Sequence, residues 1–245
     1  MIILDGAKQR PARETKGRGN FVTETDLAAE KAVLSLLANE YPDHAVLSEE
    51  TSSDVERWDE GWLWVVDPID GTHNYSQGNP NFAFNIALCH DGDPVLGLTR
   101  SPAIGDEFFA TKGGGLTVNG QPARCSDVAS IKDSVWGMDM GYDDGRAAKL
   151  LQIIVEVWPG VQAVRIMGSA ALGLAFAACG RYDFFVHSKL YPWDVAAGIV
   201  LVREGGGNIF TRDGGPVSIQ NQGVVAGASG PVAEFLELTK GRDWR

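Results

Sequence analysis

The sequence predicts a mixed α/β protein made of two halves, and three observations support this fold class. The chain has 245 residues, of which 44% are hydrophobic, so it can bury a sizeable core without a disulfide or a structural metal. Between residues 82 and 118, short apolar runs alternate with short glycine-containing turns, which indicates an antiparallel meander. From residue 135 onwards, strand patterns alternate with helical patterns, as in α/β layering. We therefore predict an N-terminal α+β half over residues 1–130 and a C-terminal α/β half over residues 131–245.

The first long helix is predicted to begin at Thr23. The segment before it, residues 1–19, turns from apolar to basic and is predicted to be mostly loop. Thr23 and Asp26 have the spacing of a capping box, which marks a helix start. Apolar residues then recur on one helical face until Tyr41 and the following proline, which should end the helix.

Short strands are predicted after this helix. The apolar run at residues 45–47 precedes a polar stretch, residues 51–59, that we expect to be a mobile loop. Residues 62–66 form a buried-strand pattern that should stop at Asp67-Pro68, because proline cannot extend a central strand ladder. The strands of the meander are predicted at residues 82–89, 95–101, 107–111 and 116–118.

The C-terminal half is predicted to alternate strands with helices. The expected strands are residues 135–140, 163–166 and 183–186, and the expected helices are residues 145–158, 169–179 and 193–204. Three glycines at residues 205–207 end the last of these helices. The sequence contains no flexible linker and no internal repeat, so the two halves should form one compact unit.

The composition excludes several classes of function. There are 32 Asp and Glu against 21 Lys and Arg, a formal net charge of -11, which repels phosphate backbones and anionic lipid heads. We therefore predict no nucleic-acid partner and no membrane contact. No signal-peptide pattern opens the chain and the longest apolar run, residues 170–179, is too short to span a bilayer, so a cytoplasmic protein is expected. Cys89, Cys125 and Cys179 are widely spaced, which predicts reduced thiols and not a disulfide framework or a zinc site.

The most informative segment is residues 67–72, Asp-Pro-Ile-Asp-Gly-Thr, directly after an apolar strand pattern. Asp67 and Asp70 can point into one space with a backbone carbonyl between them, and such hard oxygen ligands suit Mg²⁺ or Mn²⁺. The amides of Gly71 and Thr72 would follow at the start of a short helix, where free N–H groups make an anion site. An ordinary Asp-Pro, Asp-Gly turn is the alternative interpretation.

Two other carboxylate clusters also lie at the ends of apolar elements. Ser48-Glu49-Glu50 follows the run at residues 45–47, about twenty residues before the first cluster, and Trp193-Asp194 opens an apolar helix. Taken alone, the first is typical of solvated surface charge and the second of helix capping. Each is therefore a weak signal by itself.

Jointly, the three clusters resemble the inositol monophosphatase family, part of a lithium-sensitive, Mg²⁺-dependent phosphatase superfamily. The matching motifs are the Glu49-Glu50 pair, the run from Asp67 to Thr72, and Trp193-Asp194 before a helix that ends at Glu204 and three glycines. The chain also resembles the family in three further segments, residues 22–26, 115–120 and 168–172. The resemblance covers about residues 16–240.

This resemblance implies a layered αβαβα sandwich, commonly a homodimer, with the site between the two halves. It also implies two to three Mg²⁺ per site, with Mn²⁺ as an alternative. By similarity, Glu49, Asp67 and the carbonyl of Ile69 would hold one ion. Asp67, Asp70 and Asp194 would hold a second, and Glu49 with water molecules would hold a third.

Catalytic and substrate roles are also implied by similarity. Thr72 would orient a metal-activated water, with Glu49 as the proton acceptor and Asp26 hydrogen-bonded to Thr72. Lys16 lies where the family often has a basic residue, although a solvated loop lysine is the favoured interpretation. His73 is expected either at the rim of the site or in an exposed loop. The expected substrate contacts are Gly71, Thr72, Gly168, Ser169, Ala170, His187 and Asp194.

The sequence departs from the family pattern in two places. About fifteen residues precede Lys16, fewer than the family normally has there, and Pro11 disfavours a full helix, so core cover and dimer contacts should differ. His187 occupies the position, seven residues before Asp194, where the family has a Glu that contacts a substrate hydroxyl. A neutral imidazole or a cation does not replace a carboxylate acceptor, so a preference for inositol is weakened.

The leading hypothesis is Mg²⁺-dependent hydrolysis of a small polyol or sugar phosphate monoester, with inositol 1-phosphate as the nominal substrate. His187 keeps histidinol phosphate, fructose 1,6-bisphosphate and adenosine 3′,5′-bisphosphate open as alternatives. A non-catalytic homologue that binds another protein is a third hypothesis, disfavoured because every expected acidic ligand and Thr72 are present.

Overall fold

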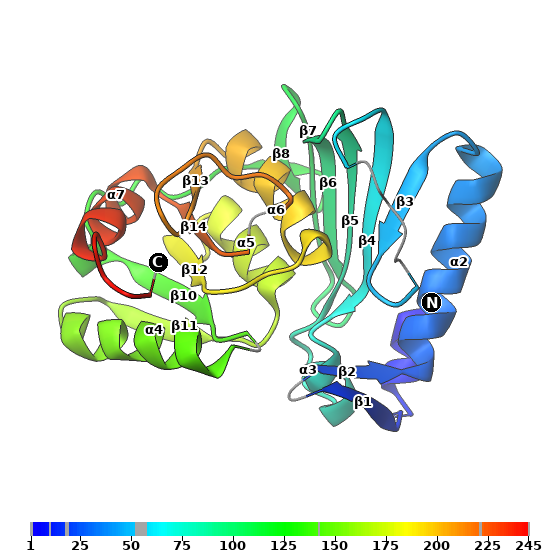
Figure 1. The fold of residues 1–245 in the computed structure, drawn as a ribbon, viewed down its shortest axis with the longest axis horizontal. Coiled ribbons are helices and arrows are strands. Elements are labelled where there is room, and N and C mark those ends of the chain that lie inside the picture. Colours follow the sequence, from blue (N-terminus) through cyan, green and yellow to red (C-terminus); the bar gives the residue numbers. More distant parts are fainter. Residues whose placement is uncertain are drawn as a thin grey trace.

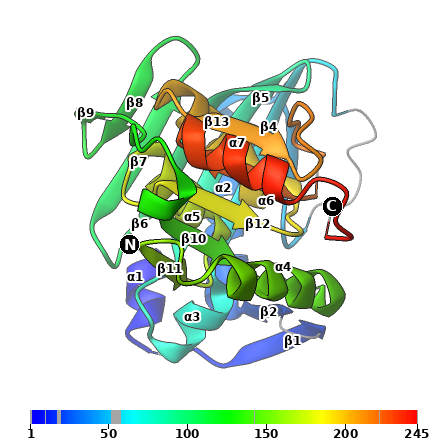
Figure 2. The ribbon, with the colours of Figure 1, turned by 90° about the vertical axis from the view of Figure 1, so that its left-hand side faces the viewer.

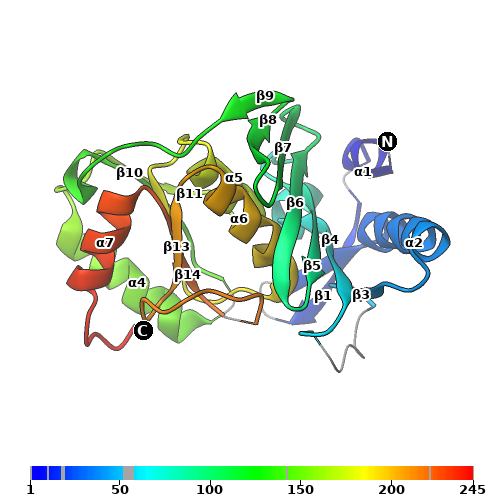
Figure 3. The ribbon, with the colours of Figure 1, turned by 90° about the horizontal axis from the view of Figure 1, so that it is seen from above.

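Five alternating layers of helix and sheet run across the molecule in Figure 1, from α2 (Glu24–Glu40) on one side to α4 (Asp144–Val157) and α7 (Ser229–Leu238) on the other. The computed structural model describes residues 2–9, 11–17, 20–51, 58–141, 143–220 and 222–244. Between its seven-stranded and five-stranded sheets lie α5 (Ala170–Ala178) and α6 (Pro192–Glu204), as Figure 3 shows from above. The predicted αβαβα sandwich is therefore confirmed.

The seven-stranded sheet follows the order of the sequence. Its strands are β3 (Ala45–Ser48), β4 (Trp62–Asp70), β5 (Ala83–His90), β6 (Asp93–Ser101), β7 (Asp106–Thr111), β8 (Gly115–Val118) and β9 (Gln121–Ala123). β3 is parallel to β4, and each later pair is antiparallel, so the predicted meander is confirmed. The strand pattern did not show β9, which is reached through a tight turn with positive φ at Asn119 (52°) and Gly120 (74°).

The first residues of the chain differ from the predicted loop. α1 (Ile2–Ala7) is a short helix, and β1 (Arg13–Gly17) pairs antiparallel with β2 (Asn20–Thr23). The residues of β1 are all exposed, so the strand carries no apolar alternation by which the sequence could have revealed it. The hydroxyl of buried Tyr75 donates to the carbonyl of Ile3 at 2.8 Å, which ties α1 to the rest of the fold. The loop prediction is therefore wrong.

Helix α2 begins as predicted. The Thr23 amide donates to Asp26 Oδ2 at 3.0 Å and the Thr25 amide donates to Thr23 Oγ1 at 3.2 Å, completing the capping box. Leu37 of this helix packs against Trp64 on the outer face of the large sheet. The burial of this apolar face fixes the start of α2, and with it Asp26, beside the end of β4.

Strand β4 does not stop at Asp67-Pro68, as the sequence suggested, but continues to Asp70. Its pairing with β5 is irregular between Asp67 and Asp70, where the strand bulges. Proline is tolerated at a bulge because no ladder hydrogen bond is needed there. The loop predicted over residues 51–59 lies largely outside the described residues, which leave out 52–57.

The five-stranded sheet has the order β11 (Ala163–Ile166), β10 (Val135–Asp139), β12 (Phe184–His187), β14 (Val224–Gly227) and β13 (Asn208–Thr211). β10 is parallel to both neighbours, whereas β14 is antiparallel to both of its own. A short 3₁₀ helix, η1 (Ile131–Asp133), precedes β10. The predicted strands and helices of this half are confirmed, while β13, β14 and α7 had not been singled out. Figure 2 shows α4 and α7 on the outer face of this sheet.

Helix α6 packs unusually close to the large sheet. A Cβ added at Gly97 of β6 would lie 2.6 Å from the carbonyl oxygen of Ala197, so only glycine leaves room for this approach. On the side of α6 that faces α5, Gly198 meets Leu174 in the same way. The beginnings of α5 and α6 are thereby held near the end of β4. Because α6 packs on both sheets, a boundary at residue 130 stays a prediction.

All three cysteines are free thiols, as predicted. Within the part of the chain that the structure describes, no helix combines the length and the apolar character needed to cross a membrane.

Candidate metal centre and substrate cleft

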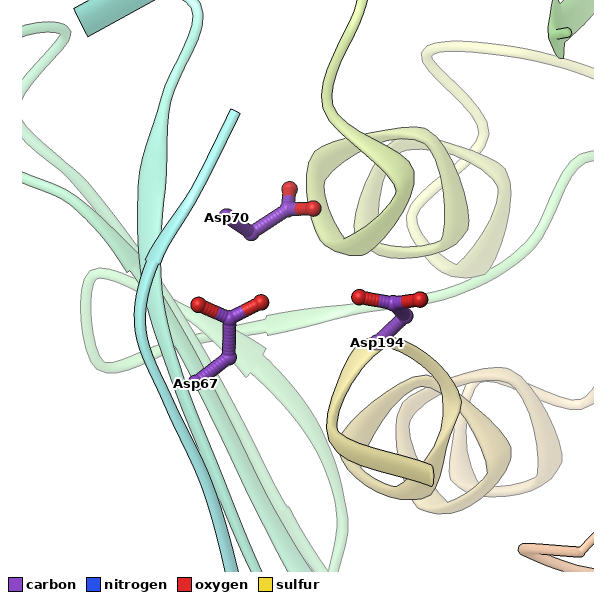
Figure 4. Close-up of side chains that lie close together, drawn as sticks. All are labelled: Asp67, Asp70 and Asp194. Carbon is purple, nitrogen blue, oxygen red and sulfur yellow. The ribbon is translucent and has the colours of Figure 1, made fainter. Parts of the chain in front are cut away.

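Three buried or half-buried carboxylates meet at the junction of β4, α5 and α6. Asp67 and Asp70 come from β4 and Asp194 comes from the first turn of α6, as Figure 4 shows. One oxygen atom from each of the three lies within 4.8 Å of the others. The sequence predicted these three residues as metal ligands, and the fold brings them together.

The bulge in β4 explains how Asp67 and Asp70 face the same space. In a regular strand, residues three positions apart point to opposite faces of the sheet. The irregular register between Asp67 and Asp70 removes that alternation, so both carboxylates face the gap between the halves. Ile69 points the other way and is fully buried against Tyr75 and Phe82, which anchors the bulge.

Asp70 is held by the beginning of α5. The Ser169 hydroxyl donates to Asp70 Oδ2, and the amides of Ala170 and Ala171 donate to its two oxygens at 3.2 and 3.1 Å. Burial raises the pKa of Asp70 to about 6, and these hydrogen bonds oppose the rise because they favour the charged form. The start of α5, in the C-terminal half, thus orients the Asp70 carboxylate of the N-terminal half.

Asp194 combines two roles that the sequence left as alternatives. Its Oδ2 accepts the Tyr191 amide at 2.7 Å, so it caps α6, while the same side chain belongs to the carboxylate cluster. The start of α6 is also tied to the large sheet, since Asn85 Nδ2 donates to the carbonyl of Trp193 at 2.7 Å. The cap and the sheet contact together orient Asp194.

The cluster has the properties of a divalent-cation site. Asp67 Oδ1 is buried and has no hydrogen-bond partner among the described residues, which is costly unless another group satisfies it. Burial and the neighbouring carboxylates raise the pKa of Asp67 and of Asp194 well above the usual value. Mg²⁺ prefers oxygen ligands, and a bound cation would relieve the repulsion between these carboxylates. The residues therefore fit the predicted ion.

Lys16 reaches this region, contrary to the favoured interpretation of a solvated loop lysine. Its Nζ lies 2.6 Å from Glu50 Oε1 and 3.4 Å from Glu49 Oε1. Burial raises the pKa of Glu49 to about 7, and the Lys16 ammonium opposes the rise. Glu49 neighbours Asp67 but lies outside the set of oxygens within 4.8 Å of one another. The contact was hidden in the sequence because it depends on the β1–β2 hairpin.

Thr72 begins α3 (Thr72–Gln77) directly after Gly71, whose φ of 86° gives the backbone its turn. The Thr72 hydroxyl is buried between two acceptors, 3.2 Å from Asp26 Oδ1 and 3.0 Å from the carbonyl of Ile69. Burial raises the pKa of Asp26, and hydrogen bonds from Thr23 and Thr72 oppose the rise. Asp26 and Thr72 therefore meet as predicted, although their catalytic roles stay predictions.

A cleft of about 290 Å³ opens beside the carboxylates. All seven expected substrate contacts line it: Gly71, Thr72, Gly168, Ser169, Ala170, His187 and Asp194. His73 also lines it and stacks on Phe21 with 5.3 Å between ring centroids, which places it at the rim. The fold thus gathers the expected residues around one cavity, and their contacts with substrate remain predictions.

His187 is buried at the end of β12 and is neutral. Burial lowers its pKa to about 3. Its Nδ1 accepts the Lys189 amide at 3.2 Å, so the single proton of the neutral ring is on Nε2. Gly141 lies against the ring, where an added Cβ would approach Cε1 to 2.8 Å. The cleft therefore has a hydrogen-bond donor where the family pattern has a carboxylate.

Asp139 is a cleft residue that the sequence reasoning missed. It ends β10, lines the cavity and accepts three backbone amides from the segment before α5. Burial raises its pKa to about 7, and the amide hydrogen bonds oppose the rise. Its position at the carboxyl end of a parallel strand was the available signal, because polar side chains gather at that edge of α/β sheets.

The chain matches a known protein family over nearly its whole length. The sequence profile described as "Inositol monophosphatase family" matches residues 2–240. The chain belongs to the inositol monophosphatase family. Members of this family are metal-dependent phosphatases, so the chain is a phosphoric monoester hydrolase. The resemblance inferred from the carboxylate motifs is confirmed.

Three relatives illustrate the family's range. An inositol monophosphatase of Dictyostelium discoideum is 34% identical over 244 residues, covering 97% of this chain and 89% of the relative. A fructose-1,6-bisphosphatase/inositol-1-monophosphatase of Thermotoga maritima is 36% identical, covering 87% and 80%. The crystal structure of the extragenic suppressor protein SuhB of Bartonella henselae superposes with a TM-score of 0.91 at 31% identity, covering 98% and 93%. Family membership therefore leaves the substrate open.

Proposed function

We propose that this protein hydrolyses a small polyol or sugar phosphate monoester in a Mg²⁺-dependent reaction. The observation that carries the proposal is the convergence of Asp67, Asp70 and Asp194, from both halves of the chain, beside a cleft that fits a small metabolite. Similarity to relatives named for inositol 1-phosphate and fructose 1,6-bisphosphate supports a substrate of this size.

Two to three Mg²⁺ are proposed. Asp67 would be shared between two ions, with Glu49 and the Ile69 carbonyl on one side and Asp70 and Asp194 on the other. Bound Mg²⁺ supplies a more acidic water, neutralises charge on the phosphate and stabilises the leaving alkoxide. The orphaned Asp67 Oδ1 supports this assignment.

The neighbouring residues prepare the proton transfer. Thr72 donates its hydroxyl proton to Asp26 or to the Ile69 carbonyl, which leaves an oxygen lone pair to orient the attacking water. Glu49 would accept the proton of that water as the general base. The Gly71 and Thr72 amides at the start of α3 would bind the phosphate oxygens.

The alcohol part of the substrate would lie toward His187. Because its Nε2 carries the proton, this residue would donate to a substrate oxygen and could not accept from a substrate hydroxyl. Inositol 1-phosphate stays the nominal substrate because of the similarity to relatives of that name, and His187 keeps histidinol phosphate, fructose 1,6-bisphosphate and adenosine 3′,5′-bisphosphate open as alternatives. A homodimer is also proposed, on the resemblance to the family.

A phosphate-release screen over these four esters tests the proposal, run with Mg²⁺ and again with EDTA. We expect turnover only with Mg²⁺, inhibition by Li⁺, and a loss of about 10³-fold or more in Asp194→Asn. The ranking of kcat/KM among the esters identifies the substrate. Full turnover in EDTA would refute the proposal, and Mg²⁺ binding in calorimetry without any turnover would favour the non-catalytic alternative.

A further inference from the structure

Asp139 holds the segment that joins β11 to α5. Its Oδ1 accepts the amides of Met167 and Gly168 at 2.9 and 2.6 Å, and its Oδ2 accepts the Ser169 amide at 3.3 Å. The side chain is buried, with 5% of the residue exposed. Three consecutive N–H groups at the end of a strand would otherwise lack partners, so one carboxylate satisfies the whole turn.

The same segment is held from the opposite side by Asn74 of α3. Asn74 Nδ2 donates to the carbonyl of Met167 at 2.8 Å and to the carbonyl of Gly168 at 3.1 Å. The amides of the segment thus face a residue of the C-terminal half, and its carbonyls face a residue of the N-terminal half. The segment is bound on both sides.

There is little room for this segment to shift. A Cβ at Gly71 would lie 3.0 Å from the carbonyl oxygen of Gly168, so the segment packs directly on the turn that follows Asp70. The next residues along the chain, Ser169 to Ala171, provide the three hydrogen bonds to the Asp70 carboxylate. Any movement of the segment would therefore move the donors that orient Asp70.

We propose that Asp139 is a positioning residue for Asp70 and that it sets the Mg²⁺ affinity of the site through residues 167–169. The inference rests on the proposed metal centre. Asp139 bonds to the segment and makes no hydrogen bond with Asp70 among the described contacts, so its effect is indirect. Groups that orient a metal ligand typically change metal affinity or activity by 10- to 100-fold.

A carboxylate is required at this position because three N–H groups converge on it. An asparagine has one acceptor oxygen, and its NH₂ group would face one of the three amides as a second donor. Asp139→Asn therefore keeps the size of the side chain while breaking at least one of the hydrogen bonds. The substitution is a nearly isosteric probe of the contact.

Asp183, which directly precedes β12, is a control that contacts the other end of β10. Its Oδ2 accepts the amide of Val135, where β10 begins, at 2.6 Å. Like Asp139 it is a carboxylate that accepts a backbone amide next to β10, but it does not line the cleft. Because the carbonyl oxygen of an asparagine can still accept this single amide, Asp183→Asn controls for the change from carboxylate to amide near β10 and should leave the metal site unaffected.

Calorimetric titration with Mg²⁺ alone, without substrate, tests the proposal. We expect Asp139→Asn to weaken Mg²⁺ binding about tenfold or more and Asp183→Asn to bind like the wild type. A Kd for Asp139→Asn within twofold of the wild type would overturn the inference. Failure of the wild-type protein itself to bind Mg²⁺ would instead refute the proposed metal centre.

A double-mutant cycle with Ser169→Ala tests the route of the effect. If Asp139 acts through the segment, the two substitutions should be clearly non-additive in the Mg²⁺ Kd, because both loosen the same donors to Asp70. Additive effects would show that Asp139 acts by another route and would overturn the inference. Should Asp139→Asn not fold, Asn74→Ala loosens the same segment from its other side and must also weaken Mg²⁺ binding.

Discussion

The Thr72 hydroxyl lies 3.2 Å from Asp26 Oδ1, although the two residues are 46 positions apart. A second acceptor, the carbonyl of Ile69, lies 3.0 Å from the same hydroxyl. Since a hydroxyl has one proton, it can donate to only one of them at a time. The orientation of Thr72 is therefore controlled by Asp26 together with the carbonyl that is the proposed metal ligand.

Removal of this hydroxyl should reduce kcat. We expect Thr72→Val, which keeps the shape, to lower kcat by about 10²-fold or more, because a lost contact to the reacting water costs that much. Thr72→Ser keeps the hydroxyl and should stay within about tenfold of the wild type. Initial-rate measurements at saturating Mg²⁺ test this, and equal rates for the Val and Ser variants would contradict it.

Replacing Lys16 should strengthen metal binding. Its ammonium lies 2.6 Å from Glu50 Oε1 and 3.4 Å from Glu49 Oε1, where it competes with a divalent cation for the same negative charge. We expect Lys16→Met to bind Mg²⁺ about threefold to tenfold more tightly at pH 8. Lys8→Met removes an exposed ammonium paired with Asp5 and serves as the control. Weaker Mg²⁺ binding in Lys16→Met would show that the lysine supports the site.

Removing the metal should make the protein less stable as the pH rises. The folded-state pKa of Glu49 is about 7 and that of Asp70 about 6, both above the unfolded values because of burial. The folded state therefore binds more protons than the unfolded state, and stability is lost as pH rises from about 5 to 8. Melting curves in EDTA should show this decline, and excess Mg²⁺ should reduce it.

Asp67→Asn should separate stability from function. In EDTA it removes a buried carboxyl group that the neighbouring carboxylates repel, and we expect the melting temperature to rise. With Mg²⁺ the wild type should have the higher melting temperature, because the variant loses the proposed shared ligand and with it the stabilisation by the ion. A variant less stable than the wild type in EDTA would contradict the electrostatic argument.

His187 should contribute to stability at neutral pH and lose that contribution in acid. Its folded pKa of about 3 lies below the unfolded value of about 6.5, so the unfolded state binds the proton first as pH falls. As the pH falls from 7.5 to 5.5, this proton uptake lowers the free energy of unfolding by about 1.4 kcal/mol. The unfolding free energy of the wild type minus that of His187→Gln should therefore be lower by that amount at pH 5.5 than at pH 7.5, as measured by urea unfolding. A pH-independent difference would show that the imidazole is accessible to protons in the folded state.

Several features of the fold could be predicted from neighbouring residues. The capping box at Thr23 and Asp26 and the alternating pattern of the meander depend on spacing along the chain, which the sequence displays directly. The identity of the carboxylate ligands came from motif resemblance. The extension of β4 past Pro68 was missed because it depends on a bulge, which is visible only in the pairing with β5.

Contacts between distant segments could not be predicted in this way. Local spacing does not reveal the contact between Lys16 and Glu50, because β1 has no apolar pattern, and it does not reveal Asp139, because no neighbour in sequence explains it. Both residues gain their partners from segments about 30 positions away. Such contacts follow from the docking of whole elements, which local spacing does not describe.

The sequence by itself determined the family, the order of the helices and strands that have a clear apolar pattern, and the chemical types gathered in the three acidic motifs, because these depend on residues adjacent in the chain. The tertiary structure decided which of the 32 acidic residues share one cavity. The bulge of β4, the start of α5 held by Asp70 across 99 positions, and the close docking of α6 on Gly97 together create that cavity. Packing between elements brings these charges together, and the hydrogen bonds that result give each carboxylate its orientation.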